Sequence, residues 1–128
     1  MTVDDLYAAW RDAFTRRDVD AILALLAPDY VLYSPGALPL VGPDSLRPAL
    51  AQAFATYDIS SSFERLELLV DGDLAVDFGW DVQTVTPRAG GEVKTARQRV
   101  VLVMRRQPDG RWLFARGLSQ PAPVPANG

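Results

Sequence analysis

The sequence contains no cysteine and no histidine, and its only lysine is Lys94. Without cysteine the chain forms no disulfide and offers no thiol chemistry. Without histidine it lacks the commonest general base, the commonest metal ligand and every Ser-His-Asp catalytic scheme. These absences exclude cysteine-dependent enzymes and serine-triad enzymes.

Long apolar runs and an excess of positive charge are also missing. No run approaches the ~18 residues that a membrane span needs. Five aspartates among the first 20 residues are incompatible with a signal peptide. The net charge of −3 argues against binding to a phosphate backbone. We therefore expect a cytoplasmic protein that binds neither nucleic acid nor a membrane.

The length of 128 residues corresponds to a single domain. Hydrophobic residues make up 48% of the chain and charged residues 23%, which is typical of a globular domain. Residues 120–128 contain three prolines and offer no core positions. We therefore expect one domain over residues 1–119, followed by a disordered tail over residues 120–128.

Helical patterns come first in the chain. Thr2 is a candidate N-cap, and apolar residues recur at helical spacing behind it through residue 14. A second, short helix is expected after residue 18, and Pro28 ends it. Asp44 is a candidate N-cap for a third helix that reaches about residue 57. Pro48 costs this helix a backbone hydrogen bond unless the helix begins later.

Strand patterns follow the helices. Residues 30–33 are rich in β-formers, and residues 61–70, 74–86, 92–106 and 111–119 have the pattern of strands joined by turns that contain Gly or Pro. This order predicts an α+β fold, with N-terminal helices packed on a strongly curved antiparallel sheet.

The alternation along residues 74–86 separates two faces. One set is apolar and includes Val76, Phe78 and Trp80, whereas the other includes Asp77 and Asp81. We expect the apolar set to face the helices and the aspartates to face solvent. Their spacing lacks the glycine and distal glutamate of a calcium loop, so no metal site is predicted. The last strand has one face of small residues, which leaves room for a cavity on the helix side: Ala115, Gly117 and Ser119.

The opposite faces of the last two strands carry large apolar side chains. Left uncovered, they would exceed a normal exposed patch. We therefore predict a homodimer that forms through the outer face of the sheet. The side chains that motivate this prediction are Val100, Leu102, Met104, Trp112, Phe114 and Leu118.

Several short segments, in their order and spacing over residues 2–119, resemble one family. They are Trp10, Asp18-Val19-Asp20-Ala21-Ile22, Leu26-Ala27-Pro28-Asp29-Tyr30, Gly42, Gly72-Asp73-Leu74-Ala75-Val76, Arg99, Met104-Arg105-Arg106 and Asp109-Gly110-Arg111-Trp112. The chain resembles the SnoaL-like branch of the nuclear-transport-factor-2-like superfamily, which includes ketosteroid isomerases and polyketide cyclases. The resemblance implies a cone-shaped α+β barrel with an internal cavity. It does not imply one reaction, because this fold hosts many chemistries.

The resemblance also implies which positions line the cavity. In ketosteroid isomerases, the oxyanion-hole tyrosine matches Trp10, and the two catalytic aspartates match Ser34 and Arg99. All three are replaced, so proton abstraction by a carboxylate at the usual place is not expected. The positions that match the cavity lining of those enzymes are Ser34, Val76, Phe78, Trp80, Arg99, Ala115, Gly117 and Ser119.

Arg99, and by alternation Arg97, is expected to point into the cavity. A buried guanidinium group needs a partner, because an unpaired buried charge is costly. The partner can be a carboxylate, enolate or phosphate of a ligand. The alternatives are a structural salt bridge, or a cavity mouth at which Arg97 reaches water.

Aromatic and hydroxyl side chains complete the candidate site. The aromatic rings either stack on a flat ligand or form plain core. The hydroxyl groups either donate a hydrogen bond to a developing oxyanion or bond to the backbone. The candidate catalytic residues are Arg99, Ser34 and Tyr30, and the candidate ligand-binding residues are Trp10, Phe14, Phe54, Phe78, Trp80, Arg97 and Ser119.

Two functions remain open from the sequence. The first is a small SnoaL-like enzyme that encloses a hydrophobic, cyclic molecule with a carboxylate or enolate end, and in which Arg99 stabilises the anion. The resemblance suggests cyclisation, isomerisation or dehydration, without an organic cofactor or a metal. The alternative is a non-catalytic domain that binds a small molecule or assembles as a dimer.

Overall fold

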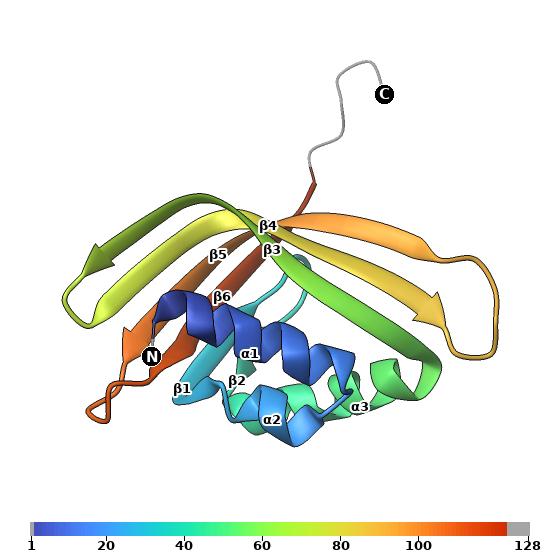
Figure 1. Ribbon diagram of the computed structural model, residues 1–128, viewed down its shortest axis with the longest axis horizontal. Coiled ribbons are helices and arrows are strands. Elements are labelled where there is room, and N and C mark those ends of the chain that lie inside the picture. Colours follow the sequence, from blue (N-terminus) through green and yellow to red (C-terminus); the bar gives the residue numbers. More distant parts are fainter. Residues whose placement is uncertain (1, 123–128) are drawn as a thin grey trace, which may run out of the picture.

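Helices precede the long strands in the computed structural model, which describes residues 2–122. The expected α+β class is confirmed (Figure 1). In chain order the elements are α1 (Val3–Thr15), α2 (Val19–Leu23), β1 (Leu26–Tyr33), β2 (Leu40–Val41), a 3-10 turn (Pro43–Leu46), α3 (Arg47–Thr56), β3 (Tyr57–Asp71), β4 (Leu74–Pro87), β5 (Lys94–Arg106) and β6 (Trp112–Pro121).

The N-termini of α1 and α2 begin at polar caps. The hydroxyl group of Thr2 accepts from the backbone N–H of Asp5 at 3.1 Å, and the carboxylate of Asp5 accepts from the backbone N–H of Thr2 at 2.7 Å. This reciprocal capping box satisfies two backbone donors that have no partner inside the helix. Asp18 caps α2 by accepting from the backbone N–H of Ala21 at 3.0 Å.

The third helix begins later than its apolar pattern suggests. Residues Pro43–Leu46 form a 3-10 turn, and the α-helix starts at Arg47. Pro48 is therefore in the first turn of α3, where the backbone nitrogen has no partner in any case. The second helix ends early as well, at Leu23, and the chain has entered β1 before it reaches Pro28.

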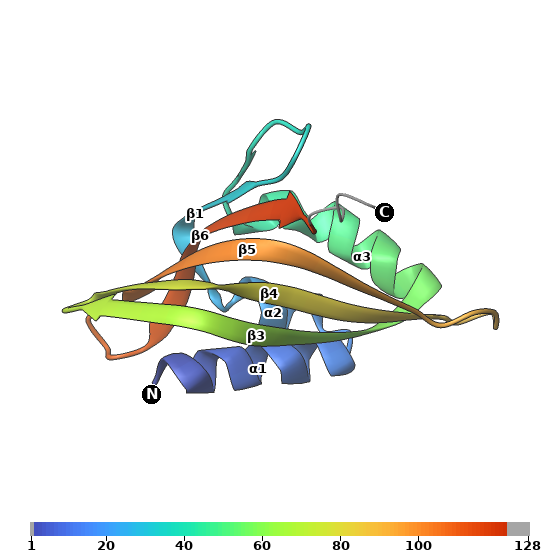
Figure 2. The same ribbon diagram turned by 90° about the horizontal axis from the view of Figure 1, so that it is seen from above.

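The six strands form one sheet in the order β2-β1-β6-β5-β4-β3. Neighbouring strands are antiparallel except β1 and β6, which pair in parallel, so the sheet is mixed rather than wholly antiparallel. The sheet is strongly curved, and the helices lie under its concave face (Figure 1). Seen from above, α1 runs beside β3 at one edge, and α3 lies toward the other (Figure 2).

The main core lies between α1, the 3-10 turn and the concave face of the sheet. Leu6 and Met104 are completely buried there, and Trp112 and Phe114 are nearly so. A second cluster joins Phe14, Ile22 and Phe54 where the three helices meet. The two clusters share Trp10 and Leu50 as partly buried neighbours, so the helices and the sheet form one continuous core.

The orientation predicted for β4 is wrong. Asp77 has no exposed surface and faces the helices, whereas the side chain of Phe78 is 37% exposed on the convex face. Alternation defines two faces but does not say which one meets the helices. Asp77 can face inward because Tyr7 and Arg65 provide its hydrogen bonds, so burying its charge does not leave it unpaired.

The face predicted to form a dimer interface is also placed wrongly. In β5 and β6, Val100, Met104, Trp112 and Phe114 are buried on the helix side of the sheet. Leu102 packs against the same core, and of that set only Leu118 is largely exposed, at 51%. The β5 residues follow the inner face of β4 because they pair with it in register, Leu102 lying opposite Asp77 and Met104 opposite Ala75. Phe114 of β6 follows in turn, because it lies opposite Met104.

A register shift in β6 changes which of its residues share a face. Met104 pairs with Phe114, but Val103 pairs with Arg116, so Ala115 has no partner on β5. The extra residue brings Phe114, Gly117 and Ser119 to one face of the sheet. Ala115 instead packs in a small buried cluster with Ala27 and Leu113.

The end of β6 lies beyond the expected domain boundary at residue 119. Gln120 pairs with Arg99, and Pro121 pairs with Gln98. The predicted tail therefore contributes its first two residues to the sheet. Residues 123–128 of that tail lie outside the described residues.

Candidate active site between the helices and the sheet

A cavity of about 320 Å³ lies between the concave face of the sheet and the helices. Its walls are mainly apolar, and its polar side chains belong chiefly to the strands. The volume suits a small cyclic molecule, and apolar walls with a few polar groups are typical of ligand sites. The apolar lining includes Trp10, Phe14, Leu26, Leu32, Leu46, Leu50, Phe63, Val100, Leu102 and Phe114.

Asp81 is the carboxylate in the wall of this cavity. It accepts hydrogen bonds from the side-chain amides of Gln98 at 3.1 Å and Gln83 at 3.2 Å, and from the hydroxyl group of Ser61 at 3.3 Å. All three donors are neutral, and among residues 2–122 no arginine or lysine forms an ion pair with Asp81. Burial therefore raises the pKa of Asp81 above its ordinary value, and the three hydrogen bonds oppose this only in part.

The sheet holds this cluster together by register. Asp81 on β4 lies opposite Gln98 on β5, and Ser61 on β3 lies opposite Gln83. Each of these residues faces the cavity because the inner face of β4 continues from Asp77 through Gly79 to Asp81 at alternate positions. The carboxylate is thus supported by neighbours on both flanking strands.

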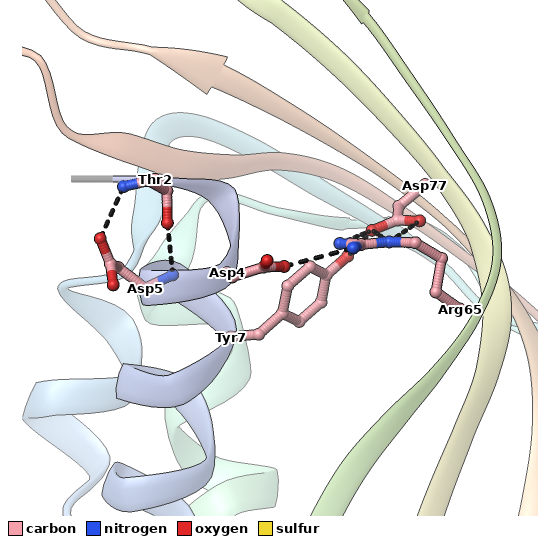
Figure 3. A network of polar contacts seen from close by, with 6 residues as sticks. All are labelled: Thr2, Asp4, Asp5, Tyr7, Arg65 and Asp77. Atoms are coloured by element: carbon pink, nitrogen blue, oxygen red, sulfur yellow. Dashed lines mark hydrogen bonds and ion pairs between the residues drawn. The ribbon is translucent and has the colours of Figure 1, made fainter.

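Asp77 lies two pleats from Asp81 on the same face but has a different environment. The Nε and Nη2 atoms of Arg65 donate to its Oδ2 at 3.0 and 2.8 Å, and the hydroxyl group of Tyr7 donates to the same oxygen at 2.8 Å. Arg65 also reaches Asp4 at 3.2 Å (Figure 3). This paired and fully hydrogen-bonded carboxylate fixes α1 to the sheet.

Tyr7 belongs to this structural network although its ring borders the cavity. The ring stacks on Phe63, with centroids 4.8 Å apart and an interplanar angle of 13°. Burial and the adjacent negative charge of Asp77 raise the pKa of Tyr7 well above its ordinary value. Its hydroxyl group therefore stays protonated and donates a hydrogen bond to Asp77.

Tyr30 places a second hydroxyl group in the cavity wall. The side chain comes from β1 and is 5% exposed, and burial raises its pKa to about 12. Among the described residues, no group forms a hydrogen bond with the hydroxyl oxygen of Tyr30. This oxygen lies next to Gly117: a side chain at that position would put its Cβ atom 2.7 Å from the oxygen. Because Gly117 has no side chain, there is room for the hydroxyl group of Tyr30 in front of it. Among the described residues, this neutral hydroxyl group has no hydrogen-bond partner.

Five of the predicted site residues line the cavity. They are Trp10 and Phe14 from α1, Tyr30 from β1, Ser34 just after β1, and Ser119 from β6. Another predicted aromatic residue, Phe54, is not among the lining residues. Its ring packs edge-on against Phe14 in the core, with centroids 5.4 Å apart.

Four predicted site residues face away from this cavity, and their placement inside it is wrong. Phe78, Trp80 and Arg99 lie on the convex face, since β4 and β5 present the opposite set to the helices. The guanidinium carbons of Arg97 and Arg99 lie 4.8 and 5.1 Å from the ring centroid of Trp80. Arg97 also pairs with Glu64 at 2.7 Å, so both charges are satisfied at the surface.

Sequence reasoning missed the polar residues of β3, β4 and β5 that face the cavity. Asp81 and Gln83 belong to the set that alternation had assigned to the solvent, and no role in the cavity was predicted for Ser61 or Gln98. Gly79 was a usable signal, because a Cβ atom there would lie 2.5 Å from the Phe63 ring. A glycine within the polar set indicates that this set faces packed side chains rather than water.

Two further observations concern metals and membranes. Residues 2–122 contain no group of three or more histidine, cysteine, aspartate or glutamate side chains arranged to hold a metal ion. In the same part of the chain, none of the helices has the length and apolar character needed to cross a bilayer.

Comparisons with known proteins place this fold. The family profile for the SnoaL-like domain matches residues 7–114. The chain belongs to the SnoaL-like domain family. No curated protein matches this SnoaL-like chain.

Solved structures similar to this SnoaL-like protein cover nearly its whole length. A protein of Planctomyces limnophilus is 26% identical, with a TM-score of 0.83 and 94% of each chain covered. A ketosteroid isomerase-like protein of Erwinia carotovora atroseptica is 28% identical, with a TM-score of 0.73 and 91% of each chain covered. A protein of Streptomyces avermitilis, described as a candidate dehydratase of the NTF2-like family, is 22% identical, with a TM-score of 0.77 and coverage of 95% and 94%. The last comparison supports the fold alone.

Proposed function

We propose that this SnoaL-like protein is an enzyme that encloses a hydrophobic, cyclic small molecule and moves a proton to and from it with the carboxyl group of Asp81. The observation that carries the proposal is a carboxylate in a mainly apolar cavity, held by three neutral donors and, in the part of the chain that the structure describes, by no cation. Burial raises its pKa toward the working range of a general acid or base.

The simplest reaction of this kind is an isomerisation. The carboxylate takes a proton from the carbon between a carbonyl group and a C=C bond. The electron pair of the broken C–H bond forms a new C=C bond as the carbonyl π pair moves onto oxygen. When the carbonyl group re-forms, the double bonds shift and the far carbon of the original C=C bond takes the proton back from the carboxyl group. Atoms and charge balance without an oxidant or a reductant. Cyclisation and dehydration start with the same proton transfer, and a dehydration ends with loss of water.

Tyr30 provides the electrophilic partner in this proposal. Its pKa of about 12 keeps the hydroxyl group protonated at neutral pH, and its donor site has no partner among the described residues. A hydrogen bond to the substrate oxygen would strengthen as negative charge develops there. Ser34 and Ser119 line the same cavity and supply further hydroxyl groups for orientation. The guanidinium group of Arg99 has no part in this mechanism because it lies on the convex face.

The experiment that tests the proposal is proton exchange in D2O. Hydrophobic cyclic ketones such as 2-tetralone are incubated with the protein, and loss of the α-proton signal is followed by NMR. We expect catalysed exchange in the wild type and a decrease of about 100-fold or more in Asp81→Asn, the lower end of the range for a general base. The matched control is Asp73→Asn, which changes a largely exposed aspartate at the start of the same hairpin.

A binding function is the second candidate, and the mainly apolar cavity wall favours it. The lining residue Trp10 reports binding through its fluorescence, independently of exchange. If ketones bind but exchange in the wild type is no faster than in Asp81→Asn, the protein is a binder and the catalytic proposal is wrong. If Asp73→Asn lowers exchange as much as Asp81→Asn, Asp81 has no special role.

A further inference from the structure

Arg11 is the one arginine in the wall of the cavity, and its charge has no partner among the described residues. Nine of the twelve arginines form ion pairs with aspartate or glutamate. Of the other three, Arg88 donates to the carbonyl oxygen of Phe54, and Arg99 lies over Trp80. Within residues 2–122, only Arg11 has neither an ion pair, a side-chain hydrogen bond nor an aromatic ring beneath it, yet it borders the cavity.

The packing of α1 along β3 places Arg11 at the level of the Asp81 cluster. The two elements run antiparallel: Asp4 contacts Arg65 near one end, and Arg17 contacts Asp58 near the other. Between these contacts, Tyr7 stacks on Phe63. Four helical residues advance about 6 Å, which equals about two residues of a strand. This spacing places Arg11 at the level of Ser61, whose hydroxyl group donates to Asp81, and both residues line the cavity.

We propose that Arg11 binds the carboxylate group of the ligand and thereby selects an acidic substrate. The planar guanidinium group presents paired N–H donors that match a carboxylate. Arg11 is exposed at the rim, so it stays hydrated without a ligand and needs no protein partner. This inference rests on the proposed function and narrows it. The substrate has an apolar cyclic body in the cavity and a carboxylate close to the position that exchanges a proton with Asp81.

A matched pair of probes tests the inference. The acid 2-naphthoate and the neutral 2-naphthamide have the same bicyclic body and differ in charge. Binding of each is measured by isothermal titration calorimetry and by the fluorescence of Trp10, at low ionic strength and at 0.5 M salt (roughly a 4 Å Debye length). The variants are Arg11→Gln and the control Arg16→Gln, which removes a charge from the C-cap of the same helix, outside the cavity lining.

The expected result is tighter binding of 2-naphthoate than of 2-naphthamide by the wild type. Arg11→Gln should weaken 2-naphthoate about tenfold, as for the loss of a charged hydrogen bond, and should leave 2-naphthamide unchanged. Arg16→Gln should change neither. Salt should weaken the acid more than the amide, and this difference should disappear in Arg11→Gln.

Three results overturn the inference alone, and a fourth overturns the proposed function with it. If the wild type binds acid and amide equally, Arg11 is not the anion site, although the cavity still binds a ligand. The same holds if Arg16→Gln weakens the acid as much as Arg11→Gln does. It also holds if the affinity for the acid is unchanged in Arg11→Gln. If neither probe binds any variant, the cavity does not bind bicyclic aromatic ligands, and the proposed function fails together with the inference.

Discussion

Asp77 and Asp81 lie on the same face of β4, and only Asp77 is paired with a cation. Arg65 and Tyr7 hold Asp77 with four hydrogen bonds, whereas neutral amides and a hydroxyl group hold Asp81 beside an apolar cavity. Two carboxylates of one strand thus have separate environments, and such separation is how proteins assign different roles to the same chemical group. Asp77 joins α1 to the sheet, and Asp81 is available to a ligand.

The first prediction concerns the pH dependence that Asp81 adds to stability. Its pKa in the folded protein is raised above the unfolded value, so the folded state binds its proton more tightly. The stability from this group is present below the unfolded pKa and is lost as pH rises through the folded pKa. Asp81→Asn removes the titrating carboxyl group, so the variant does not lose this stability as pH rises. We expect its Tm at pH 8 to equal or exceed that of the wild type, with the wild type gaining relative to the variant toward pH 4.

Thermal melts of both proteins between pH 4 and pH 8 measure this difference. The control is Asp73→Asn, because Asp73 is largely exposed and forms its ion pair with Arg106 at the surface. A Tm for Asp81→Asn at pH 8 that is lower by more than ~4 °C, about 1 kcal/mol in a domain of this size, contradicts the prediction. It would mean that the hydrogen bonds to the carboxylate outweigh its burial.

The second prediction is that Asp77→Asn destabilises the fold. Asp77 is completely buried, and its removal leaves the partly buried guanidinium group of Arg65 with only Asp4 as a partner. Breaking one side of a buried ion pair costs about 3 kcal/mol or more. Chemical denaturation should show this loss for Asp77→Asn and less than ~1 kcal/mol for Asp73→Asn, whose ion pair with Arg106 is exposed. Similar losses in the two variants would show that the buried network is not a structural anchor.

The order of elements could be predicted from the sequence, but the orientation of the strands could not. Caps at Thr2 and Asp18 and the turns between strands are local features, and the structure contains them. Whether Asp77 or Phe78 faces the helices depends on Arg65 and Tyr7, which are distant in the sequence. Binary patterning treats an aspartate as solvent-facing, and it fails where a distant cation and a tyrosine satisfy that aspartate.

The candidate site could be predicted only in part, because residue patterning identifies apolar inward faces but misplaces polar residues that face inward. Trp10, Phe14 and Tyr30 lie on elements whose inner face is plainly apolar, and they line the cavity as expected. Asp81 was assigned to the solvent because a polar cavity wall and a polar surface have the same period of two. Only Gly79 distinguished them, through the close approach of Phe63.

The third prediction uses Gly117 to test the donor role of Tyr30. A Cβ atom at Gly117 would lie 2.7 Å from the hydroxyl oxygen of Tyr30 and 3.2 Å from a methyl carbon of Leu32. Gly117→Ala must therefore displace the hydroxyl group, while Tyr30→Phe deletes it. We expect both variants to slow ketone exchange by 10-fold or more, about 1.4 kcal/mol, and the double variant to be no slower than the slower single one.

The exchange rates of the wild type, the two single variants and the double variant form a double-mutant cycle. Additive losses would show that Gly117 acts independently of Tyr30. Near-normal exchange in Tyr30→Phe would remove the hydroxyl group from the proposed mechanism. Trp10 fluorescence should show that the ketone still binds to Tyr30→Phe, because the apolar walls remain.

The fourth prediction is a homodimer through the convex face of the sheet, which carries a different set of residues from the one expected. Phe78, Val101, Leu118 and Tyr33 lie opposite one another across four strands, and Phe78, Leu118 and Tyr33 are 37%, 51% and 43% exposed. These residues form one contiguous apolar patch, and such a patch indicates an interaction surface, whereas apolar residues scattered singly on a surface do not. We propose that a second copy of the chain covers this patch, burying about 1,200 Å² or more in total.

Sedimentation velocity at micromolar concentration tests this interface. The wild type should sediment as a dimer, and Val101→Glu, which places a charge at the centre of the patch, should sediment as a folded monomer. Phe78→Ser is the second variant, so that the result does not depend on one substitution. Leu38→Glu is the control, because Leu38 is 88% exposed in the loop between β1 and β2, away from the patch. Its dimer should persist, since only charges placed on the convex face oppose association. A wild-type monomer, or a dimer that both convex-face variants leave intact, contradicts the proposed interface.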